Sequence, residues 1–288
     1  MRIDLHVHTN ASDGLFAPAE VVRKARAAGL SALGIADHDT VNGIGEALEA
    51  AAAEGIMLVP GVEINAYHGD FEYHILGYFI DHRDARLAVA LAELRDARVR
   101  RMRLIVSKLG ELGMEVSPGE ILAVSGDGSV GRPHIARVMV SKGLVSSIRE
   151  AFDRFIGEGK PAYAPRSKLT PAEAIALIKA AGGLAVLAHP GLCGGDDLIP
   201  QLAAWGIVGL EVYTPDHTGA QVGRYRQFAK ELGLIATGGS DFHGWNTSSG
   251  CTFGVGRTPP GEFARLLELA GVRPELWTAR PPASRGNG

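Results

Sequence analysis

Residues 4–14 of the chain read DLHVHTNASDG, and this stretch decides the fold. Its apolar residues alternate with His6 and His8, which lie two positions apart and therefore point to the same side of a strand. Two imidazoles on one face of an apolar strand are costly to bury without a partner. Asp13 follows in a loop and adds a carboxylate. The stretch predicts a strand that delivers metal-ligand side chains to a site near its carboxyl end.

Strand and helix patterns alternate from this stretch onwards. We expect strands over residues 2–9, 31–39, 56–64 and 73–80, with helices after Pro18 and over residues 43–55. Pro near the start of the first helix and Gly29 beyond its end are the usual boundary signals. Alternating strands and helices favour a parallel sheet or barrel.

The pattern changes after Asp81. The stretch LRDARVRRMRLIVSKLGELG, residues 94–113, carries apolar residues at helical spacing. Shorter helices are expected near residues 118–124, 133–142 and 148–155, and we find no strand signal among them. We therefore interpret residues 84–159 as a helical insert over the active site.

Strand–helix alternation resumes after the insert and continues through IATGGSDFH, residues 235–243. We predict an α/β fold in which residues 1–83 and 160–279 form one discontinuous barrel domain. Residues 280–288 are rich in Pro, Gly and Ser and are expected to form a flexible tail.

Composition excludes several classes of protein. Hydrophobic residues make up 46% of the 288 positions, enough for a sizeable core, and the formal net charge of −3 argues against binding polyanions over the whole surface. Two cysteines are too few for a disulfide framework or a thiolate zinc site. We see no secretion signal, no apolar run long enough to cross a membrane and no DNA-binding domain. These features favour a cytoplasmic protein, and they leave the oligomeric state open.

Ligand-type side chains recur where the predicted strands begin or end. In a barrel of parallel strands the carboxyl ends meet at one face, where such enzymes place their sites. We expect His68, His82 and His217 to be structural or surface residues, but so many placements at strand ends are not independent accidents. The candidate ligands are His6, His8, Asp13, His38, Glu63, His74, His189, Asp241 and His243.

This donor set indicates which ions could bind. Imidazole and carboxylate without thiolate suit manganese, zinc or iron. Nine ligands exceed the three or four that one catalytic ion needs, so two or three ions are implied. Such clusters clamp a phosphoryl group and generate hydroxide at neutral pH. The pattern therefore predicts a metal-dependent phosphoesterase.

The motifs DLHVHTNASDG, IADHDT, GVEI, AHP and GSDFH resemble those of the polymerase and histidinol phosphatase (PHP) family in type, order and spacing. The resemblance implies a distorted (β/α)7 barrel with three divalent ions, manganese being the first candidate. It implies that His6, His8, Glu63 and Asp241 hold one ion and are catalytic. Glu63 would bridge to a second ion held with His74 and His189. Asp13, His38 and His243 would hold the third.

The insert narrows the choice within the family. With GRPHIAR at residues 131–137 and GEGKPAYAP at residues 157–165, it resembles a bacterial branch that removes the 3′-phosphate of nucleoside 3′,5′-bisphosphates. Members of that branch also trim short 5′-phosphorylated RNA from the 5′ end. Arg132 and His134 are the first candidates for substrate phosphate contacts, because arginine suits bidentate phosphate binding. Lys160, Tyr163 and Arg166 are further candidates. The alternative for GRPH is a plain helix start, with Pro133 at the first helical position.

Two alternatives stay open for the activity, and one for the basic run. Another family phosphomonoesterase, such as histidinol phosphatase, would call for acidic pocket residues. A non-catalytic metal-binding module would have lost ligands, and none of the nine is missing. The run Arg95–Arg103 could follow an RNA backbone. We favour instead the solvated face of an amphipathic helix.

Overall fold

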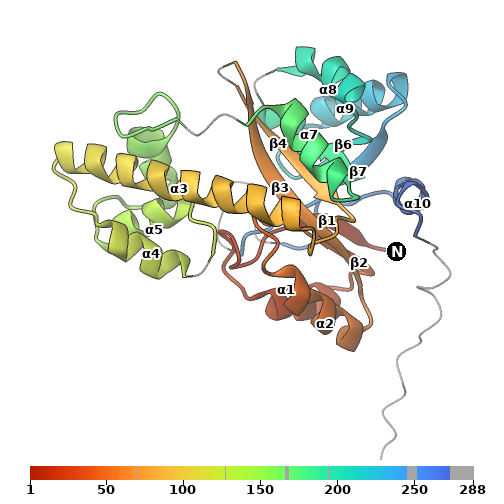
Figure 1. Cartoon of the computed structure of the whole chain (residues 1–288), viewed down its shortest axis with the longest axis horizontal. Coiled ribbons are helices and arrows are strands. Elements are labelled where there is room, and N and C mark those ends of the chain that lie inside the picture. Colours follow the sequence, from red (N-terminus) through yellow and green to blue (C-terminus); the bar gives the residue numbers. More distant parts are fainter. Residues whose placement is uncertain (70, 127, 166–168, 194, 245–251, 273–288) are drawn as a thin grey trace, which may run out of the picture.

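Seven strands in the described residues form one sheet that curls into a nearly closed barrel (Figure 1). The computed structural model describes residues 1–69, 71–126, 128–165, 169–193, 195–244 and 252–272. The sheet order follows the chain: β1 (Ile3–Val7), β2 (Ala32–Ile35), β3 (Met57–His68), β4 (Phe71–Tyr78), β5 (Leu184–Leu187), β6 (Gly209–Tyr213) and β7 (Ile235–Gly238). A parallel bridge between Val7 and Phe242 joins the two edges. The expected α/β barrel is confirmed.

One strand departs from the expected parallel arrangement. β4 runs antiparallel to both β3 and β5. β3 also continues to His68, beyond residue 64, where we expected it to end. The connection from His68 to Phe71 is too short for a parallel crossover, which needs a dozen residues or more. Because β4 is reversed, its beginning lies at the same barrel face as the ends of the other strands.

Helices cover the outside of the barrel. They are α1 (Pro18–Ala27), α2 (Ile44–Glu54), α7 (Pro171–Ala180), α8 (Ile199–Trp205), α9 (Gly219–Glu231) and α10 (Pro260–Leu269), with short 3-10 turns at Pro190–Leu192 and Asp196–Leu198. The starts of α7 and α9 are fixed by capping boxes, in which Thr170 and Thr218 accept from backbone N–H groups. The helices bury their apolar faces against the sheet, so the strand ends form the remaining open face.

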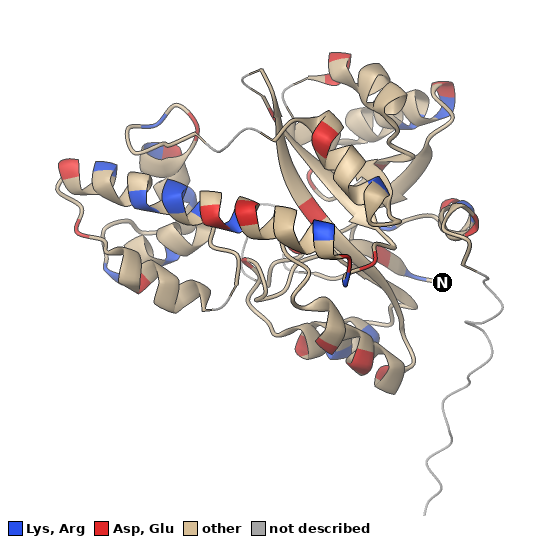
Figure 2. Cartoon of the chain, viewed as in Figure 1, with Lys and Arg blue, Asp and Glu red and all other residues tan. Residues whose placement is uncertain are grey.

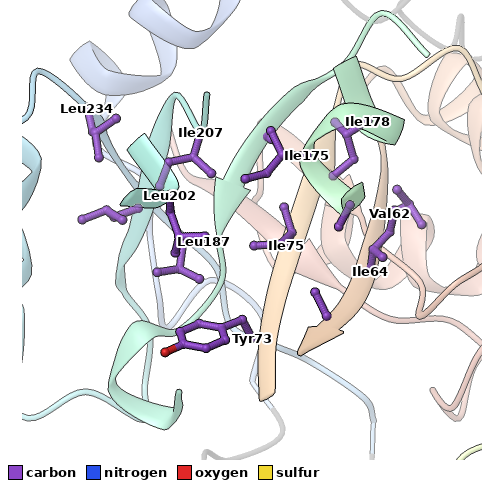
Figure 3. Packing of buried hydrophobic residues seen from close by; sticks show 14 of the residues in the cluster. Val62, Ile64, Tyr73, Ile75, Ile175, Ile178, Leu187, Leu202, Ile207 and Leu234 are labelled. Atoms are coloured by element: carbon purple, nitrogen blue, oxygen red, sulfur yellow. The ribbon is translucent and has the colours of Figure 1, made fainter. Parts of the chain in front are cut away.

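The barrel core shows this packing directly. Val62 and Ile75 on β3 and β4 face Ile175 and Ile178 of α7 (Figure 3). These four side chains are at most 1% exposed. Burying a side chain of this size stabilises a fold by about 1.5–3 kcal/mol. This packing holds in place the β3–β4 hairpin, which carries two of the predicted ligands.

The described chain between β4 and α7 is helical and extends to one side of the barrel (Figure 1). It contains α3 (Ala85–Glu111), α4 (Pro118–Ser125), α5 (Arg132–Ser141), α6 (Ile148–Ala151) and a π-helical turn (Phe152–Ile156). Asp84 caps α3 by accepting from the N–H groups of Arg86 and Leu87. The insert has an apolar cluster of its own, built around residues such as Met102, Ile135 and Met139.

The basic run on α3 is not the solvated face that we expected. Charged residues of both signs follow α3 along its length (Figure 2). Arg100 and Arg103 are exposed, but Arg98 and Arg101 are each only 5% exposed. Arg98 forms an ion pair with Asp39 of the barrel, with 2.5 Å between Nε and Oδ2. The expectation was wrong for these two residues because each guanidinium donates to a buried acceptor.

None of the described helices combines the length and the apolar character needed to cross a bilayer.

Candidate metal centre

The nine ligand-type residues predicted from the sequence converge at the open face of the barrel. β1, β3 and β4 carry ligands within or directly after their strand residues, and the loops after β1, β2, β5 and β7 supply the others. The side chains form four overlapping groups whose ligand atoms lie within 4.8 Å of one another. The groups are His8–Asp13–His38–His243, His6–His8–Asp241, His6–Glu63–His189 and His38–Glu63–His74.

The first set of atoms meets at the end of β1. The Nε2 atoms of His6 and His8 lie 3.1 Å apart. Oδ1 of Asp241 lies 3.4 Å from the first nitrogen and 3.0 Å from the second. Oε2 of Glu63 lies 3.5 Å and 3.3 Å from the same two atoms. Two nitrogens and two oxygens therefore point at one small volume, as ligands of a single ion would.

The other oxygen of Glu63 faces a second set. Its Oε1 lies 2.8 Å from Nδ1 of His74 and 3.1 Å from Nε2 of His189. The Glu63 side chain is 1% exposed, so both oxygens are withheld from water. One carboxylate thus contacts two neighbouring groups of imidazoles, which is the geometry of a bridging ligand.

The third set lies around Asp13. Its Oδ1 is 3.3 Å from Nε2 of His243, and its Oδ2 is 3.9 Å from Nε2 of His38. The ring of His8 stacks on that of His243 with 4.0 Å between centroids. Nδ1 of His38 lies 2.8 Å from Oε2 of Glu63. The structure therefore places His8 and His38 between sets, and the three sets form one continuous cluster.

The hydrogen bonding of the cluster fits divalent ions better than a closed protein network. Several buried ligand atoms have no hydrogen-bond partner in the described structure, although oppositely charged atoms lie nearby. Buried polar groups are normally paired, so this concentration of unpaired atoms needs an explanation. Bound cations would satisfy them, because lone pairs of imidazole and carboxylate are metal donors. The atoms are His8 Nδ1, Asp13 Oδ1, His38 Nδ1, Glu63 Oε2, His189 Nδ1 and Asp241 Oδ1.

The electrostatics keep the carboxylates ionised. Burial alone would raise the pKa of Glu63, but His38, His74 and His6 around it hold that pKa well below its usual range. Burial likewise opposes ionisation of Asp241, and the neighbouring His6 and His243 hold its pKa well below normal. Ionised carboxylates are the metal-binding form. The cluster therefore has ready anionic ligands at neutral pH.

The histidines divide into two classes before a metal binds. Burial, with positive charge from His243 and His38, lowers the pKa of His8 to about 3, so this imidazole is neutral. Burial would lower the pKa of His74 and of His243, but Glu63 raises the first to about 9 and Asp13 raises the second to about 10. Metal ligation requires neutral imidazole, so binding would release protons from the second class.

Three buried carboxylates outside the predicted ligand set contact the ligands or the backbone and loop residues near them. Both oxygens of Glu211 lie 3.1 Å from Nδ1 of His6, and one accepts from the backbone N–H of His189. Asp4 accepts from the N–H of Ser240, next to Asp241. A carboxylate on the outer nitrogen of a ligand histidine fixes its tautomer and ring orientation.

Asp37 is the third of these carboxylates. Its oxygens accept from the N–H and the hydroxyl of Thr9 and from the hydroxyl of Ser12. These bonds shape the loop that carries Asp13. We did not predict Asp4, Asp37 or Glu211 as site residues, although an acidic residue inside an apolar strand, as in GLEVY at residues 209–213, is a readable signal.

The backbone at two ligands is in an uncommon conformation. His189 has φ of 23° and Asp241 has φ of 50°, a region that non-glycine residues rarely adopt. Such conformations persist where surrounding contacts enforce them, and they concentrate at functional sites. Gly239 precedes this turn, and a side chain there would overlap Cβ of His6 and the carboxylate of Glu211. The turn after β7 can therefore approach β1 only with glycine at this position.

A cavity of about 330 Å³ opens beside the cluster. Arg132 lines it from the start of α5, with its guanidinium carbon 5.5 Å from the ring centre of Phe152 and 6.0 Å from that of Tyr163. Its Nη2 lies 3.7 Å from Oε2 of Glu72, another residue that lines the cavity. The lining residues are His38, Glu63, Phe71, Glu72, His74, Arg132, Glu158, His189, Leu192, Cys193 and Asp241.

The other predicted substrate contacts occupy different positions. His134 is 2% exposed, and its Nδ1 accepts from the N–H of Gly131, which caps α5. Lys160 is exposed, and Tyr163 is half-buried against Arg132, and neither lines the described part of the cavity. Arg166 lies outside the described residues. Among the candidates that the structure describes, only Arg132 lines the cavity.

The chain is similar to known proteins over most of its length. The profile of the PHP domain matches residues 4–114. A 5′-3′ exoribonuclease from Haemophilus influenzae is 37% identical over 252 residues, which cover 85% of this chain and 92% of that protein. A 3′,5′-nucleoside bisphosphate phosphatase from Chromobacterium violaceum is 35% identical over 247 residues, covering 84% and 87%. A solved structure described as a metal-dependent phosphoesterase, from Bifidobacterium adolescentis, has a TM-score of 0.86 at 32% identity, covering 93% and 96%.

Proposed function

The chain belongs to the PHP family of phosphoesterases, and on this premise we propose that it removes the 3′-phosphate of nucleoside 3′,5′-bisphosphates. We propose further that it trims short 5′-phosphorylated RNA from the 5′ end. Relatives named for these two activities match it at 35–37% identity over most of their length. Both activities cleave a phosphoester next to a second phosphate, so one site can serve both.

The observation that carries the proposal is the pairing of the ligand cluster with Arg132 in one cavity. His38, Glu63, His74, His189 and Asp241 line that cavity, and Arg132 lines it from the insert. Divalent ions held by the cluster would bind the phosphate that is cleaved. A second phosphate needs a cation of its own, and arginine binds phosphate through two parallel hydrogen bonds.

The residues suggest which groups would bind each of the two phosphates. The three sets around Glu63 and Asp13 would hold divalent ions, which when bound neutralise phosphoryl charge and supply a water of lowered pKa. Glu63 fixes the spacing between two sets through its two oxygens. Arg132 would bind the phosphate that is not cleaved and so orient the ester toward the cluster.

We assign no covalent step to Cys193, although it lines the cavity. Its Sγ lies 3.7 Å and 3.9 Å from the carbonyl oxygens of Ala188 and His189, so it faces the backbone. Direct transfer of the phosphoryl group to water needs no protein nucleophile. A single turnover in ¹⁸O-labelled water should place one label in the released phosphate, and a trapped phosphoenzyme would refute this scheme.

Histidinol phosphate remains the second candidate substrate. An amino-alcohol carries positive charge and calls for acidic residues near the phosphate. Glu72 and Glu158 line the cavity and could supply them. Arg132 in the same wall would repel such a substrate, so we rank it second.

The family and the donor set indicate divalent metal ions. We propose three ions, with manganese first and zinc or iron as alternatives, because the donors are imidazole and carboxylate without thiolate. We propose the cytoplasm as the site of action, since nucleotides and short RNA are the substrates.

A substrate screen tests the proposal. The purified full chain, loaded with manganese, is assayed for phosphate release from adenosine 3′,5′-bisphosphate, histidinol phosphate and an aryl phosphate, and for trimming of a short RNA. We expect the highest kcat/KM for the bisphosphate and stepwise shortening of 5′-phosphorylated RNA from its 5′ end. A higher kcat/KM for histidinol phosphate would overturn the assignment.

A further inference from the structure

Glu72 places a negative charge in the cavity that is proposed to bind two phosphates. It lies near the start of β4, opposite Tyr67 in the hairpin, and it lines the cavity together with His74 and Arg132. Its side chain is 21% exposed. A carboxylate here would repel a phosphate unless its charge is already engaged, so its contacts decide what it does.

The two carboxylate oxygens of Glu72 contact different partners. Oε1 accepts from Nδ2 of Asn65 at 2.9 Å and lies 3.2 Å from Nε2 of His74. Oε2 lies 3.7 Å from Nη2 of Arg132, which is ion-pair distance. One carboxylate therefore touches both a candidate metal ligand and the candidate substrate arginine.

The orientation of the His74 ring shows what the contact between its Nε2 and Glu72 does. Nδ1 of this ring lies 2.8 Å from Oε1 of Glu63, so this nitrogen faces the cluster. Nε2 lies beside both Oε1 of Glu72 and Nδ2 of Asn65, and of these two atoms only the carboxylate oxygen can accept a proton. With Nδ1 turned to the cluster, the proton of the neutral ring belongs on Nε2, with Glu72 as its acceptor. An outer carboxylate of this kind holds a ligand histidine in one tautomer and one ring orientation. Glu72 thus contacts the outer ring nitrogen of His74, as Glu211 contacts that of His6.

The insert holds the same network from a second side. Nη2 of Arg98, on α3, donates to Oδ1 of Asn65 at 2.6 Å, and Asn65 in turn donates to Glu72. Arg132 comes from α5, so two helices of the insert reach Glu72 or its partner. The β3–β4 hairpin is therefore fixed between the insert and the cluster at this point.

We propose that Glu72 is a positioning residue that couples the substrate arginine Arg132 to the metal ligand His74. By holding both side chains, it sets the distance between the bound second phosphate and the phosphoester to be cleaved. The part that concerns Arg132 rests on the proposed function. The part that concerns His74 does not, because metal binding can be measured without substrate.

The test is Glu72→Gln, which keeps the size of the side chain and removes its charge. Glu115→Gln, at an exposed position of the insert, is the matched control. Manganese retained per chain is measured by elemental analysis after equilibration with a series of chelator concentrations. We expect Glu72→Gln to weaken retention by roughly ten- to a hundred-fold, the usual effect of losing an outer partner of a ligand.

The second measurement is kinetic and uses saturating manganese. We expect Glu72→Gln to raise KM for adenosine 3′,5′-bisphosphate by roughly two- to five-fold, the range for a partly exposed ion pair. KM for an aryl phosphate, which has no second phosphate, should change less. Urea unfolding of both variants checks the fold, and Glu72→Asp, which keeps the charge on a shorter side chain, should fall between the wild type and Glu72→Gln.

Each outcome decides the proposal. Weakened retention together with a selective rise in KM supports it. Unchanged retention would show that Glu72 does not orient His74, and weakened retention with equal KM changes on both substrates would rule out the coupling to Arg132. If no bisphosphate is hydrolysed even by the wild type, the proposed function and the coupling both fail, while the retention measurement still decides the role of Glu72 toward His74.

Discussion

Nδ1 of His6 lies 3.1 Å from both carboxylate oxygens of Glu211, a residue 205 positions later in the chain. Both side chains are fully buried. The contact turns Nε2 of His6 toward His8 and Asp241, so the carboxylate of β6 determines which imidazole nitrogen is available to a metal on β1.

Glu211→Gln should therefore weaken metal binding without touching the cluster directly. Glutamine can accept only through its oxygen and loses the charge that favours a donating Nδ1. We expect roughly ten- to a hundred-fold weaker manganese affinity, measured by chelator competition. Glu231→Gln, on the exposed face of α9, is the control and should match the wild type. Unchanged affinity in Glu211→Gln would remove this residue from the site.

His6→Ala and Asp241→Ala should each abolish turnover, because each removes an atom from the set that includes both Nε2 nitrogens. Elemental analysis of manganese-grown wild type should give more than one ion per chain, and both variants should hold fewer. His68→Ala, at an exposed position, should keep both the metal and the activity. Full activity of metal-stripped protein would contradict the assignment.

Arg132→Ala should separate the two phosphates of the proposed substrate. Loss of a charged hydrogen bond costs about 1.5–3 kcal/mol, so kcat/KM for adenosine 3′,5′-bisphosphate should fall by roughly ten- to a hundred-fold. Hydrolysis of an aryl phosphate should fall much less. Arg26→Ala, exposed on α1, is the control. Equal losses on both substrates would mean that Arg132 serves the reacting phosphate or the fold.

His134 should make the insert sensitive to acid. Burial lowers the pKa of His134 from 6.5 to about 4. As the pH falls, the unfolded chain therefore binds a proton at this ring before the folded protein does. The resulting stability is present above pH 6.5 and is lost as the pH falls toward 4. For the metal-free protein, the loss between pH 7 and 4.5 should exceed that of His134→Gln by about 2–3 kcal/mol, measured by urea unfolding. Parallel profiles for the two proteins would contradict this account.

Arg98→Ala should destabilise the fold far more than Arg100→Ala on the same helix. Arg98 is buried and contacts Asp39 and Asn65, so its removal leaves the Asp39 carboxylate without its cation. Breaking a buried ion pair from one side costs about 3–5 kcal/mol. Arg100 is exposed, and its loss should change the free energy of unfolding by about 0.5 kcal/mol or less. Urea unfolding of the two variants gives the comparison, and equal effects would mean that Arg98 is not a structural anchor.

Much of the fold could be predicted because the barrel strands have simple signals. Apolar runs that end in His or Asp, as at His6, His38 and His189, indicate both a strand and its functional end. The reversal of β4 was missed because its apolar pattern looks the same in either direction. The short connection between His68 and Phe71 was the available signal.

The supporting residues were harder to predict than the ligands. A ligand is recognisable by its type at a strand end, whereas Asp4, Asp37 and Glu211 are recognisable only by what they contact across the barrel. The burial of Arg98 could not be predicted for a related reason. A helix rich in arginine can be solvated on every face, and only the partner at Asp39 shows that one face is covered.

The length of α3 bears on how the protein meets its substrate. Leu87 and Leu91, near its beginning, belong to the barrel core, and Ile105 and Leu109, near its end, belong to the core of the insert. One uninterrupted helix of 27 residues therefore packs into the apolar core of the barrel at its beginning and into that of the insert at its end. Moving the insert away from the barrel would require α3 to bend or one of its ends to leave the core in which it is buried. The entrance to the cavity should thus keep nearly the same width with and without substrate, so that recognition depends on a preformed shape rather than on closure.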